Sequence, residues 1–463
     1  MKILKLLTVC LALAQANLSY AEDLLTVYQQ ALEADPELKT AELKVEIGAA
    51  QKGQALGQML PQINANANWS ANNQRLLGAA ATPAIPATPT STSNYHGTRY
   101  TIALSQTLLD FEKFWTWRHA QEIENQYASE NIEAQHALMF NVVEKYFDVL
   151  DAEDQLTLVQ AEKETTIRQL EQVQKQYAKQ LVLITDLYEV EARLDQIKAD
   201  EIEAETILVT ARESLKELTN TTPVALYKLR DEIEYKELEG ALDNWIEVAK
   251  SENPTLAAQL SAIAAAGNDV AAQKSKYMPV VDLQLNYYST NTGFNSVNLG
   301  RNVETQVAAI NVNVPLFTGG TTTNKMYEAQ HKLSISKYEN EAKIRALIKE
   351  TSDSFLSSNA NVRRISATRK ALASAIKSRE SMESGFRYGV QTISDVLDAQ
   401  QDEFRSRRDL SQAKYSYIKN KMRFLKAVGL ISEENMVEVN NWLQVMPKQA
   451  EKNSDKQSKS NAG

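Results

Sequence analysis

The chain has 463 residues, and its 50 basic and 59 acidic side chains give a formal net charge of −9 at pH 7. This acidic balance disfavours binding to nucleic acid. The single cysteine, Cys10, excludes an internal disulfide, and only 15 glycines and 10 prolines favour long uninterrupted helices.

The first residues have the pattern of a secretory signal peptide. Lys2 and Lys5 flank the start of an apolar run that reaches Ala16, and Ser19-Tyr20-Ala21 places small residues at both cleavage-specifying positions. We expect cleavage after Ala21. No later segment approaches the roughly 18 consecutive apolar residues that a spanning helix needs. A chain of this kind that crosses a membrane must do so as a closed β-barrel.

The mature sequence repeats itself. A shift of 218 places Pro36 on Pro254 and Pro61 on Pro279, and later a shift of 209 places Ile184-Thr185-Asp186-Leu187 on Ile393-Ser394-Asp395-Val396. Collinear prolines and acidic motifs favour an internal duplication over chance similarity between two Ala-rich helical stretches.

The two offsets differ by nine, so the first half holds nine extra residues, which we assign to a Pro- and Thr-rich loop over 78–94. The expected organisation is a signal peptide at 1–21, a first structural repeat at 22–223, a linker at 224–241, a second repeat at 242–430, a further segment at 431–446 and a disordered tail at 447–463.

Each repeat is expected to contain two β-strands. Apolar and polar residues alternate from Ile63 to Trp69 and from Val281 to Tyr287, and further strands are expected around Tyr100 to Gln106 and from Val303 to Phe317. Four strands are too few to close a barrel, whereas three chains supply twelve. A soluble sandwich with one wetted face would show the same alternation.

The rest of each repeat is expected to be helix. Shorter helices follow Pro36 and Pro254, and long helices are expected over residues 120–178, 185–218, 326–384 and 392–427. Because only a few residues join the members of each long pair, the pairs must be antiparallel hairpins. The last helix carries a coiled-coil stripe with one polar position: Leu410, Ala413, Tyr417, Asn420, Phe424 and Ala427. Helices of this length favour a tubular assembly over a compact soluble bundle.

The chain resembles the TolC family over almost all of its mature length. The most specific segment runs from Met382 to Leu430 and contains Tyr388-Gly389-Val390-Gln391-Thr392 followed by an Asp-rich helix start. Val314-Pro315-Leu316-Phe317 resembles the end of the last strand of that family.

The resemblance implies an α+β membrane protein that acts as a homotrimer. It implies a 12-stranded β-barrel in the outer-membrane lipid, with four strands per chain, continued by a periplasmic α-helical barrel of coiled-coil hairpins. A mixed equatorial band would come from residues 220–240 and 432–442. The implied function is a gated exit duct of a tripartite efflux pump or a type I secretion system. Its partners would be a periplasmic adaptor (membrane fusion) protein and an inner-membrane pump or ABC transporter, with no cofactor and no enzymatic activity.

Asp395 and Asp398 are three residues apart, so both carboxylates share one face of a helix. The resemblance places that face at the narrow periplasmic entrance, where three chains would bring six carboxylates together. Mutual repulsion would raise the pKa of some of them and favour multivalent cations. The alternative is a solvated helix face on which Asp395 caps the helix start.

The resemblance also implies links that hold the entrance closed, at Thr185, Asp186, Phe386 and Gln391. Phe386 stands in place of a tyrosine and lacks its hydroxyl, and Gln391 stands in place of an arginine. We therefore expect a more weakly held closed state unless other contacts compensate.

The hairpin ends are the expected contacts for the adaptor, at Gln180 and Leu181 in the first hairpin and at Gly389 and Val390 in the second. Gln180 occupies a position where the family usually has glycine, which predicts a tighter or different turn at the first end.

Other chemistry finds little support in the sequence. His96, His119, His136 and His331 have no metal-ligand spacing, and neither a Gly-rich phosphate loop nor a Gly-x-Ser-x-Gly motif occurs. The aromatic pair Trp115 and Trp117 fits either an interfacial anchor or ordinary packing. The alternative function is a periplasmic coiled-coil adaptor or scaffold without a pore, which would not fractionate with the outer membrane. The sequence does not identify the cargo.

Overall fold

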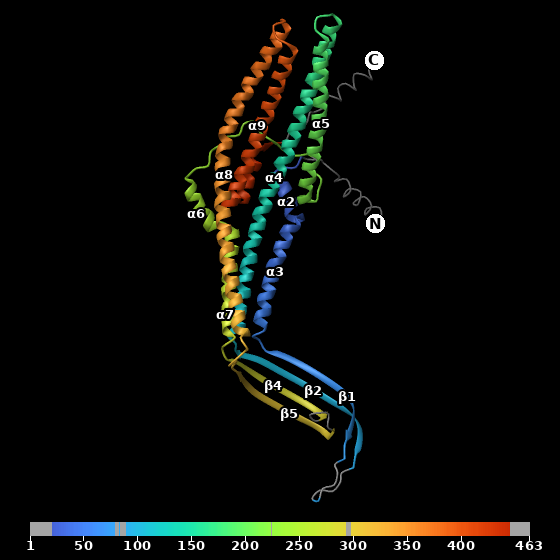
Figure 1. Cartoon of the computed structure of the whole chain (residues 1–463), viewed down its shortest axis with the longest axis vertical. Helices are drawn as coiled ribbons and strands as arrows, with labels where there is room; N and C mark the ends of the chain where they lie inside the picture. Colours follow the sequence, from blue (N-terminus) through green and yellow to red (C-terminus); the bar gives the residue numbers. More distant parts are fainter. Residues whose placement is uncertain (1–20, 79–82, 84–88, 224, 293–297, 445–463) are drawn as a thin grey trace, which may run out of the picture. The chain divides into compact units, whose positions relative to one another are not determined.

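The computed structural model describes residues 21–78, 83, 89–223, 225–292 and 298–444 (Figure 1). Residues 1–20 of the expected signal peptide and the expected tail at 447–463 lie outside the described residues. The chain divides into two compact units. The first comprises the described parts of 1–41, 130–256 and 343–463, and the second comprises those of 42–129 and 257–342.

The same order of elements occurs twice along the chain. The first set is α2 (Leu24–Ala34), α3 (Pro36–Gly57), β1 (Gln62–Leu76), β2 (Ser91–Leu109), α4 (Phe111–Ala178) and α5 (Ile184–Thr219). The second set is α6 (Leu242–Glu252), α7 (Pro254–Ser275), β4 (Val280–Thr292), β5 (Asn298–Asn313), α8 (Thr321–Arg387) and α9 (Ile393–Val428). The exact bounds of the predicted repeats stay a prediction.

Three short elements lie outside these two sets. They are β3 (Lys228–Leu229), α10 (Glu433–Asn440) and β6 (Leu443–Gln444), and β3 pairs with β6 in an antiparallel manner. The segments expected to form an equatorial band therefore contain a two-stranded sheet and a short helix.

The second unit contains a four-stranded antiparallel sheet in the order β1-β2-β4-β5. The register separates its side chains into two faces. The apolar face carries Ile63, Trp69, Ile102, Leu285 and Ile310, whereas the opposite face is mostly amide and hydroxyl side chains. Most large apolar side chains on the first face are more than half exposed, for example Ile63 at 69% and Ile310 at 66%. The alternation expected from the sequence is thus present, and it leaves an apolar face open within one chain.

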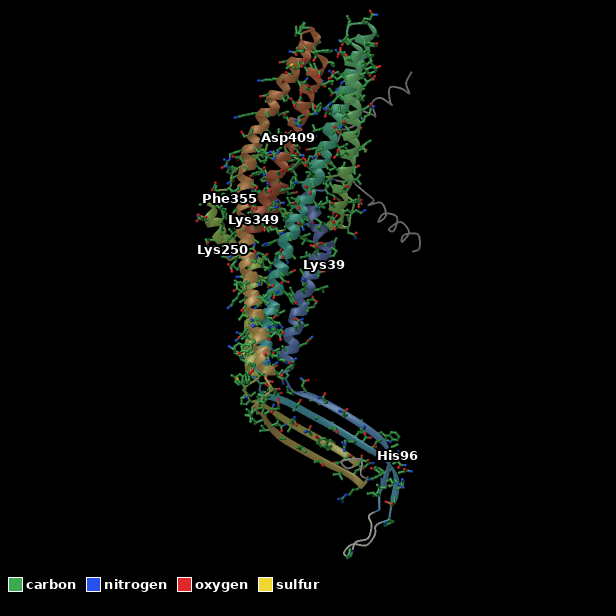
Figure 2. The ribbon with its side chains drawn as sticks, in the orientation of Figure 1. Lys39, His96, Lys250, Lys349, Phe355 and Asp409 are labelled. Carbon is green, nitrogen blue, oxygen red and sulfur yellow. The ribbon has the colours of Figure 1, made fainter. Side chains whose placement is uncertain are left out.

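The β1–β2 ribbon extends beyond the four-stranded part of the sheet. Arg99 of β2 pairs with Thr290 of β4, but Ser91 to Thr98 pair only with β1. The loop expected over 78–94 is therefore too long, because residues 91–94 belong to β2. Its Ser, Thr and Asn residues are typical of turns, but cross-strand pairing with Asn73–Leu76 holds residues 91–94 in the ribbon. Figure 2 shows His96 in this ribbon, where its ring stacks on Trp69 at 5.2 Å.

Other boundaries also differ from those expected from the sequence, among them the start of α4 and the end of β5. Helix α4 begins at Phe111 and not at Ala120, because Asp110 Oδ1 accepts hydrogen bonds from the amides of Glu112 (2.9 Å) and Lys113 (3.2 Å). The tryptophans considered as possible interfacial anchors therefore lie in the first turns of this helix. Strand β5 ends at Asn313, ahead of Pro315, which has no amide hydrogen for a sheet.

The first unit has its largest core where α4 and α9 meet the N-terminal helix α2. Val142, Tyr146 and Phe147 of α4 are fully buried there, and Ile418 and Met422 of α9 are also fully buried. Most of the coiled-coil stripe expected in α9 is buried, including Ala413, Tyr417, Phe424 and Ala427. Among the described helices, none has both the length and the apolar composition needed to cross a bilayer.

Candidate functional site

The two long hairpins of the first unit end in the same turn. The amides of Gln180 and Leu181 donate to the carbonyls of Tyr177 (2.8 Å) and Gln176 (3.0 Å) at the end of α4. At the end of α8, Gly389 and Val390 donate to Phe386 (3.1 Å) and Gly385 (3.0 Å) in the same pattern. This is the usual closure of a helix by a left-handed residue.

The expectation of a different turn at the first end is wrong. Gln180 has a φ of 57° and Gly389 has a φ of 74°, so both adopt the left-handed conformation. Gln180 carries a Cβ in a region that favours glycine, which costs about 1 kcal/mol but leaves the turn unchanged. The departure from glycine changes the side chain that the turn presents and not its backbone.

The hairpin ends also present exposed apolar side chains. Leu181 is 70% exposed in the first hairpin, and Tyr388 and Val390 are 84% and 74% exposed in the second. Monomeric surfaces rarely group such side chains without a binding role. Both ends are therefore candidate docking surfaces.

Asp395 caps the start of α9. Its Oδ2 accepts hydrogen bonds from the amide (2.9 Å) and the hydroxyl (2.7 Å) of Thr392, and the Thr392 hydroxyl accepts one from the Asp395 amide (3.2 Å). The hydrogen bond from the Thr392 hydroxyl, followed by that from its amide, lowers the pKa of Asp395. The alternative role as a capping acid is thus present in the chain. It is compatible with a pore role, because the cap uses one carboxylate oxygen.

Asp398 lies one turn further along α9 and is exposed. It shares a helix face with Asp395, as the spacing predicts. The two carboxylates are therefore both accessible near the hairpin end.

The four expected gate residues lie at the hairpin ends, but they differ in their contacts. Asp186 accepts a hydrogen bond from the Leu183 amide (3.0 Å) and so caps α5, in the position that matches Asp395 in α9. Phe386 is half-buried. Within the described chain, the exposed side chains of Thr185 and Gln391 form no hydrogen bond.

One apolar cluster joins the two hairpins near these ends. Val173 and Val190 of the first hairpin and Ile393 and Leu397 of the second are buried in it. The Phe386 ring packs against this cluster, where a tyrosine hydroxyl would need a polar partner. The loss of the hydroxyl is therefore accompanied by apolar packing.

An ion-pair network that the sequence analysis missed lies further along the second hairpin. Glu403 of α9, whose side chain is 6% exposed, accepts hydrogen bonds from Arg379 of α8 and from Arg407 Nη2 (2.6 Å). Arg379 also pairs with Glu383 (2.8 Å). Burial opposes ionisation of Glu403, but the hydrogen bonds from Arg407 and Arg379 outweigh it and lower its pKa. We call Arg379, Glu383, Glu403 and Arg407 the hairpin clamp.

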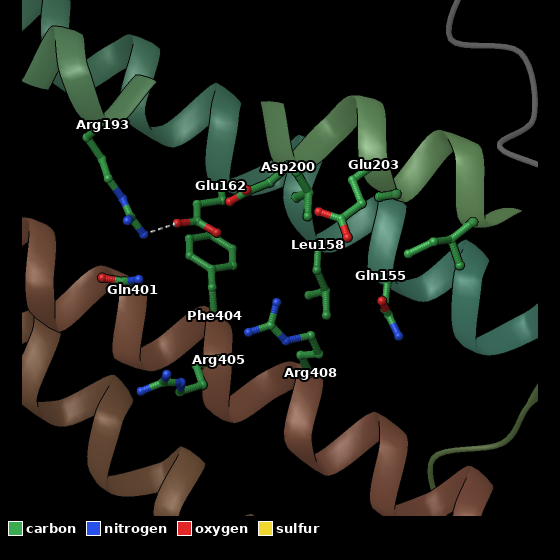
Figure 3. Close-up of a pocket in the computed structure, with 13 residues that line it drawn as sticks. Gln155, Leu158, Glu162, Arg193, Asp200, Glu203, Gln401, Phe404, Arg405 and Arg408 are labelled. Atoms are coloured by element: carbon green, nitrogen blue, oxygen red, sulfur yellow. Dashed lines mark hydrogen bonds and ion pairs between the residues drawn. The ribbon is translucent and has the colours of Figure 1, made fainter. Parts of the chain in front are cut away.

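A polar cavity of about 250 Å³ separates the hairpins between the apolar cluster and the main core (Figure 3). Glu162 forms an ion pair there with Arg193 at 2.9 Å. Burial raises the pKa of Glu162, and Arg193 only partly offsets this effect. Arg405 and Arg408 line the cavity from α9, and among the described residues neither has a carboxylate partner within ion-pair distance. The two hairpins are thus packed together at two levels and separated by charged groups between them.

Comparison with known proteins gives concordant results. The model of a family described as outer membrane efflux protein matches residues 27–221 and 245–430. The chain is 30% identical over 451 residues to the outer membrane protein TolC of Vibrio cholerae, covering 96% of this chain and 100% of that protein. It is 26% identical to the alkaline protease secretion protein AprF of Pseudomonas aeruginosa, covering 90% of this chain and 86% of that protein. The crystal structure of the Campylobacter jejuni CmeC outer membrane channel has the same fold, with a TM-score of 0.78 at 17% identity, and covers 92% of this chain and 90% of that one.

Proposed function

The chain belongs to the outer membrane efflux protein family, and from this premise we propose that it is the gated exit duct of a tripartite efflux pump or a type I secretion system. The duct would receive cargo from an inner-membrane pump or ABC transporter through a periplasmic adaptor. The observation that carries the proposal is the pair of hairpin ends with matching turns, which present exposed apolar side chains at both ends and, at the second, the exposed Asp398 beside the half-buried Asp395.

Family membership confirms the coarser part of the sequence analysis. The protein is an outer-membrane channel with a periplasmic helical extension, and it is not an enzyme. Its fold is that of one chain of a trimer, with four strands in a 12-stranded β-barrel and long hairpins in a helical barrel. Channels of this family work with pump and adaptor partners. The alternative of an adaptor without a pore is therefore wrong.

The proposed constriction is formed by Asp395 and Asp398 from three chains. Asp398 is exposed, and Asp395 keeps one carboxylate oxygen outside its cap. Rings of carboxylates select cations and hold multivalent ones most strongly. The stability of the closed state would depend on four residues near the adjacent turns: Thr185, Asp186, Phe386 and Gln391.

The proposed adaptor contact is made by the four turn residues Gln180, Leu181, Gly389 and Val390. Because both turns have the same backbone, an adaptor hairpin would meet two similar apolar surfaces per chain. We expect Leu181→Asp to weaken capture of the cognate adaptor by the purified trimer, and V390D to do the same. If both variants captured the adaptor as well as the parent does, Leu181 and Val390 would not be part of the adaptor contact.

The decisive experiment is conductance of the purified trimer in a planar bilayer. Hexaamminecobalt(III) added on the periplasmic side should block the current, and the Asp395→Asn, Asp398→Asn double variant should need about tenfold more of it. Asp195→Asn, which removes an exposed carboxylate from α5, is the matched control. Hexaamminecobalt(III) should block this variant at the same concentration as the parent. Equal block of the double variant and the parent would reject the two aspartates as the cation site. A trimer without conductance would reject the duct.

A further inference from the structure

The polar face of the sheet carries very few charges. In the described strands its charged side chains are Asp282 and Arg99, placed there by the register of β2 and β4, and Arg301, which we assign to this face from its two-residue spacing to Val303, beside the register shift of β5. The remaining positions are mainly amides and hydroxyls, including Asn64, Asn66, Asn68, Ser70 and Asn72 of β1. A few charges on a neutral surface dominate its local potential.

These charges are separated along the strands. Asp282 pairs with Thr107 and Asn311 near the helix-linked ends of the strands, whereas Arg99 pairs with Thr290 close to the opposite ends. The two levels are eight positions apart along β4, which corresponds to roughly 27 Å. This distance is several times the screening length of about 8 Å at physiological salt, so Asp282 does not neutralise Arg99.

Arg301 lies at nearly the same level as Arg99. Val303 of β5 pairs with Thr290, the same residue that pairs with Arg99, and Arg301 is two positions nearer the start of β5. Both arginines are exposed, and among the described residues neither guanidinium has a carboxylate within ion-pair distance. Their positive charges are therefore available to solutes.

The packing around Gly97 gives independent evidence for which side chains lie on the polar face. A Cβ at Gly97 would lie 2.6 Å from Thr292 Cγ2 and 2.7 Å from Ser70 Oγ, so these three residues converge on the polar face. Gly97 is two residues from Arg99 in β2, and alternate residues of a strand share a face. Arg99 therefore belongs to the same face as the asparagine row of β1.

We propose that Arg99 and Arg301 form a basic collar at the outer mouth of the duct, which binds soluble multivalent anions inside the lumen. The proposal rests on the proposed function, because only a closed trimer turns the polar face into a lumen and brings six arginines together. The helix-linked ends of the strands continue into the periplasmic extension, so the arginine level is the outer one. Guanidinium groups bind phosphate and carboxylate groups in a bidentate manner, and arginine rings occur in anion-selective pores.

The collar is the opposite in sign to the proposed aspartate entrance at the hairpin ends. A cargo with carboxylate or phosphate groups would thus be attracted at the mouth, and soluble polyanions outside the cell would be held there. The partner chemistry is a free multivalent anion in the lumen. A lipid phosphate would have to approach from the apolar face, where Arg75 of β1 lies.

The test uses purified trimers in bilayers of neutral phospholipid, with sodium tripolyphosphate as the probe. Tripolyphosphate added to the compartment that the outer mouth faces should block the current through the parent. The Arg99→Gln, Arg301→Gln double variant should need about tenfold more tripolyphosphate for the same block. Arg75→Gln, on the apolar face of the same ribbon, is the matched control and should behave like the parent.

Ion selectivity provides a second readout. In the Asp395→Asn, Asp398→Asn background, loss of both collar arginines should lower the chloride-to-potassium permeability ratio about threefold. Unchanged block and unchanged selectivity in a conducting collar variant would overturn the collar while leaving the duct intact. Block lost equally in the Arg75→Gln control would assign the anion to the apolar face and also overturn the proposal. The absence of any current would reject the proposed function itself.

Discussion

The hairpin clamp should make the second hairpin depend on buried charge at a level where the first hairpin has apolar side chains. At the offset of 209 that relates the two turns, Arg379 and Glu403 correspond to Leu170 and Leu194, and Leu194 is buried. At this level the second hairpin thus has an ion pair where the first has two leucines, while the ion pairs of the first hairpin, such as Glu162–Arg193, lie at other levels. We predict that Glu403→Leu destabilises the hairpin end, and that the Arg379→Leu, Glu403→Leu double variant largely restores it.

The magnitude follows from the exposure of the three side chains. Removing one partner of a buried ion pair costs about 3–5 kcal/mol. The Arg379 and Arg407 side chains are 24% and 43% exposed, so solvent screening reduces the expected cost of Glu403→Leu to about 2–3 kcal/mol. Replacing both partners by apolar residues is often neutral, so the double variant should lie within about 1 kcal/mol of the parent.

Hydrogen exchange measured by mass spectrometry on peptides covering residues 376–410 of the intact trimer is a suitable assay. A loss of about 2–3 kcal/mol accelerates exchange through local opening by roughly 30- to 150-fold. Peptides from the first hairpin serve as the internal control. Exchange in the double variant as fast as in Glu403→Leu would refute the reasoning, because it would show that the ion pair and the leucine pair are not equivalent.

The clamp also predicts a pH dependence. The pKa of Glu403 is lower in the folded protein than its ordinary value of about 4.3, so its stabilising contribution is complete above that value. The contribution is lost as the pH falls through the lowered folded pKa. In the double variant this acid-side loss at the hairpin end should be absent.

Three further predictions concern other parts of the chain. Gln180→Gly should stabilise the first turn by about 1 kcal/mol and slow its amide exchange, whereas Gly389→Gln should have the opposite effect on the second turn; equal exchange in parent and variants would contradict this. Gly97→Ala should cost about 1–3 kcal/mol and lower the yield of heat-sensitive trimer on gels, because its Cβ would meet a threonine of β4, while Gly53→Ala should not lower it because space is open there. Since the pKa of Glu162 is raised, the parent should lose stability as the pH rises from the ordinary glutamate value through the raised one, and E162Q should abolish that loss in denaturant unfolding at a series of pH values; parallel pH profiles would count against it.

Local patterns in the sequence were sufficient for most elements. Alternation from Ile63 to Trp69 identified β1, and the absence of glycine and proline identified the long helices. The predicted boundaries of elements were wrong where a single contact determines the start of a helix or strand. The Asp110 cap starts α4 nine residues earlier than expected, and pairing with β1 extends β2 back to Ser91.

The candidate site was predictable only in part, for a physical reason. Residues close in sequence, such as Asp395 and Asp398, can be placed on one helix face from their spacing. The link between Arg379 and Glu403 spans 24 positions and depends on the register of two helices, which neither side chain reveals. The turn at Gln180 differs from the prediction because glycine favours the left-handed conformation but is not required for it, and the end of α4 imposes that conformation on glutamine.

The ion pair of Arg379 and Glu403, where the first hairpin has two leucines, has a consequence for the response to salinity. Concentrated electrolyte weakens a partly exposed ion pair, whereas salts such as sulfate strengthen the association of leucines. A rise in external osmolarity carried by such salts should therefore weaken the second hairpin at the level of Arg379 and Glu403 but strengthen the matching leucine level of the first, where the salt-sensitive ion pair Glu162–Arg193 lies elsewhere in the hairpin. Two hairpins with the same order of elements would thus respond to one change of medium at different levels along their length.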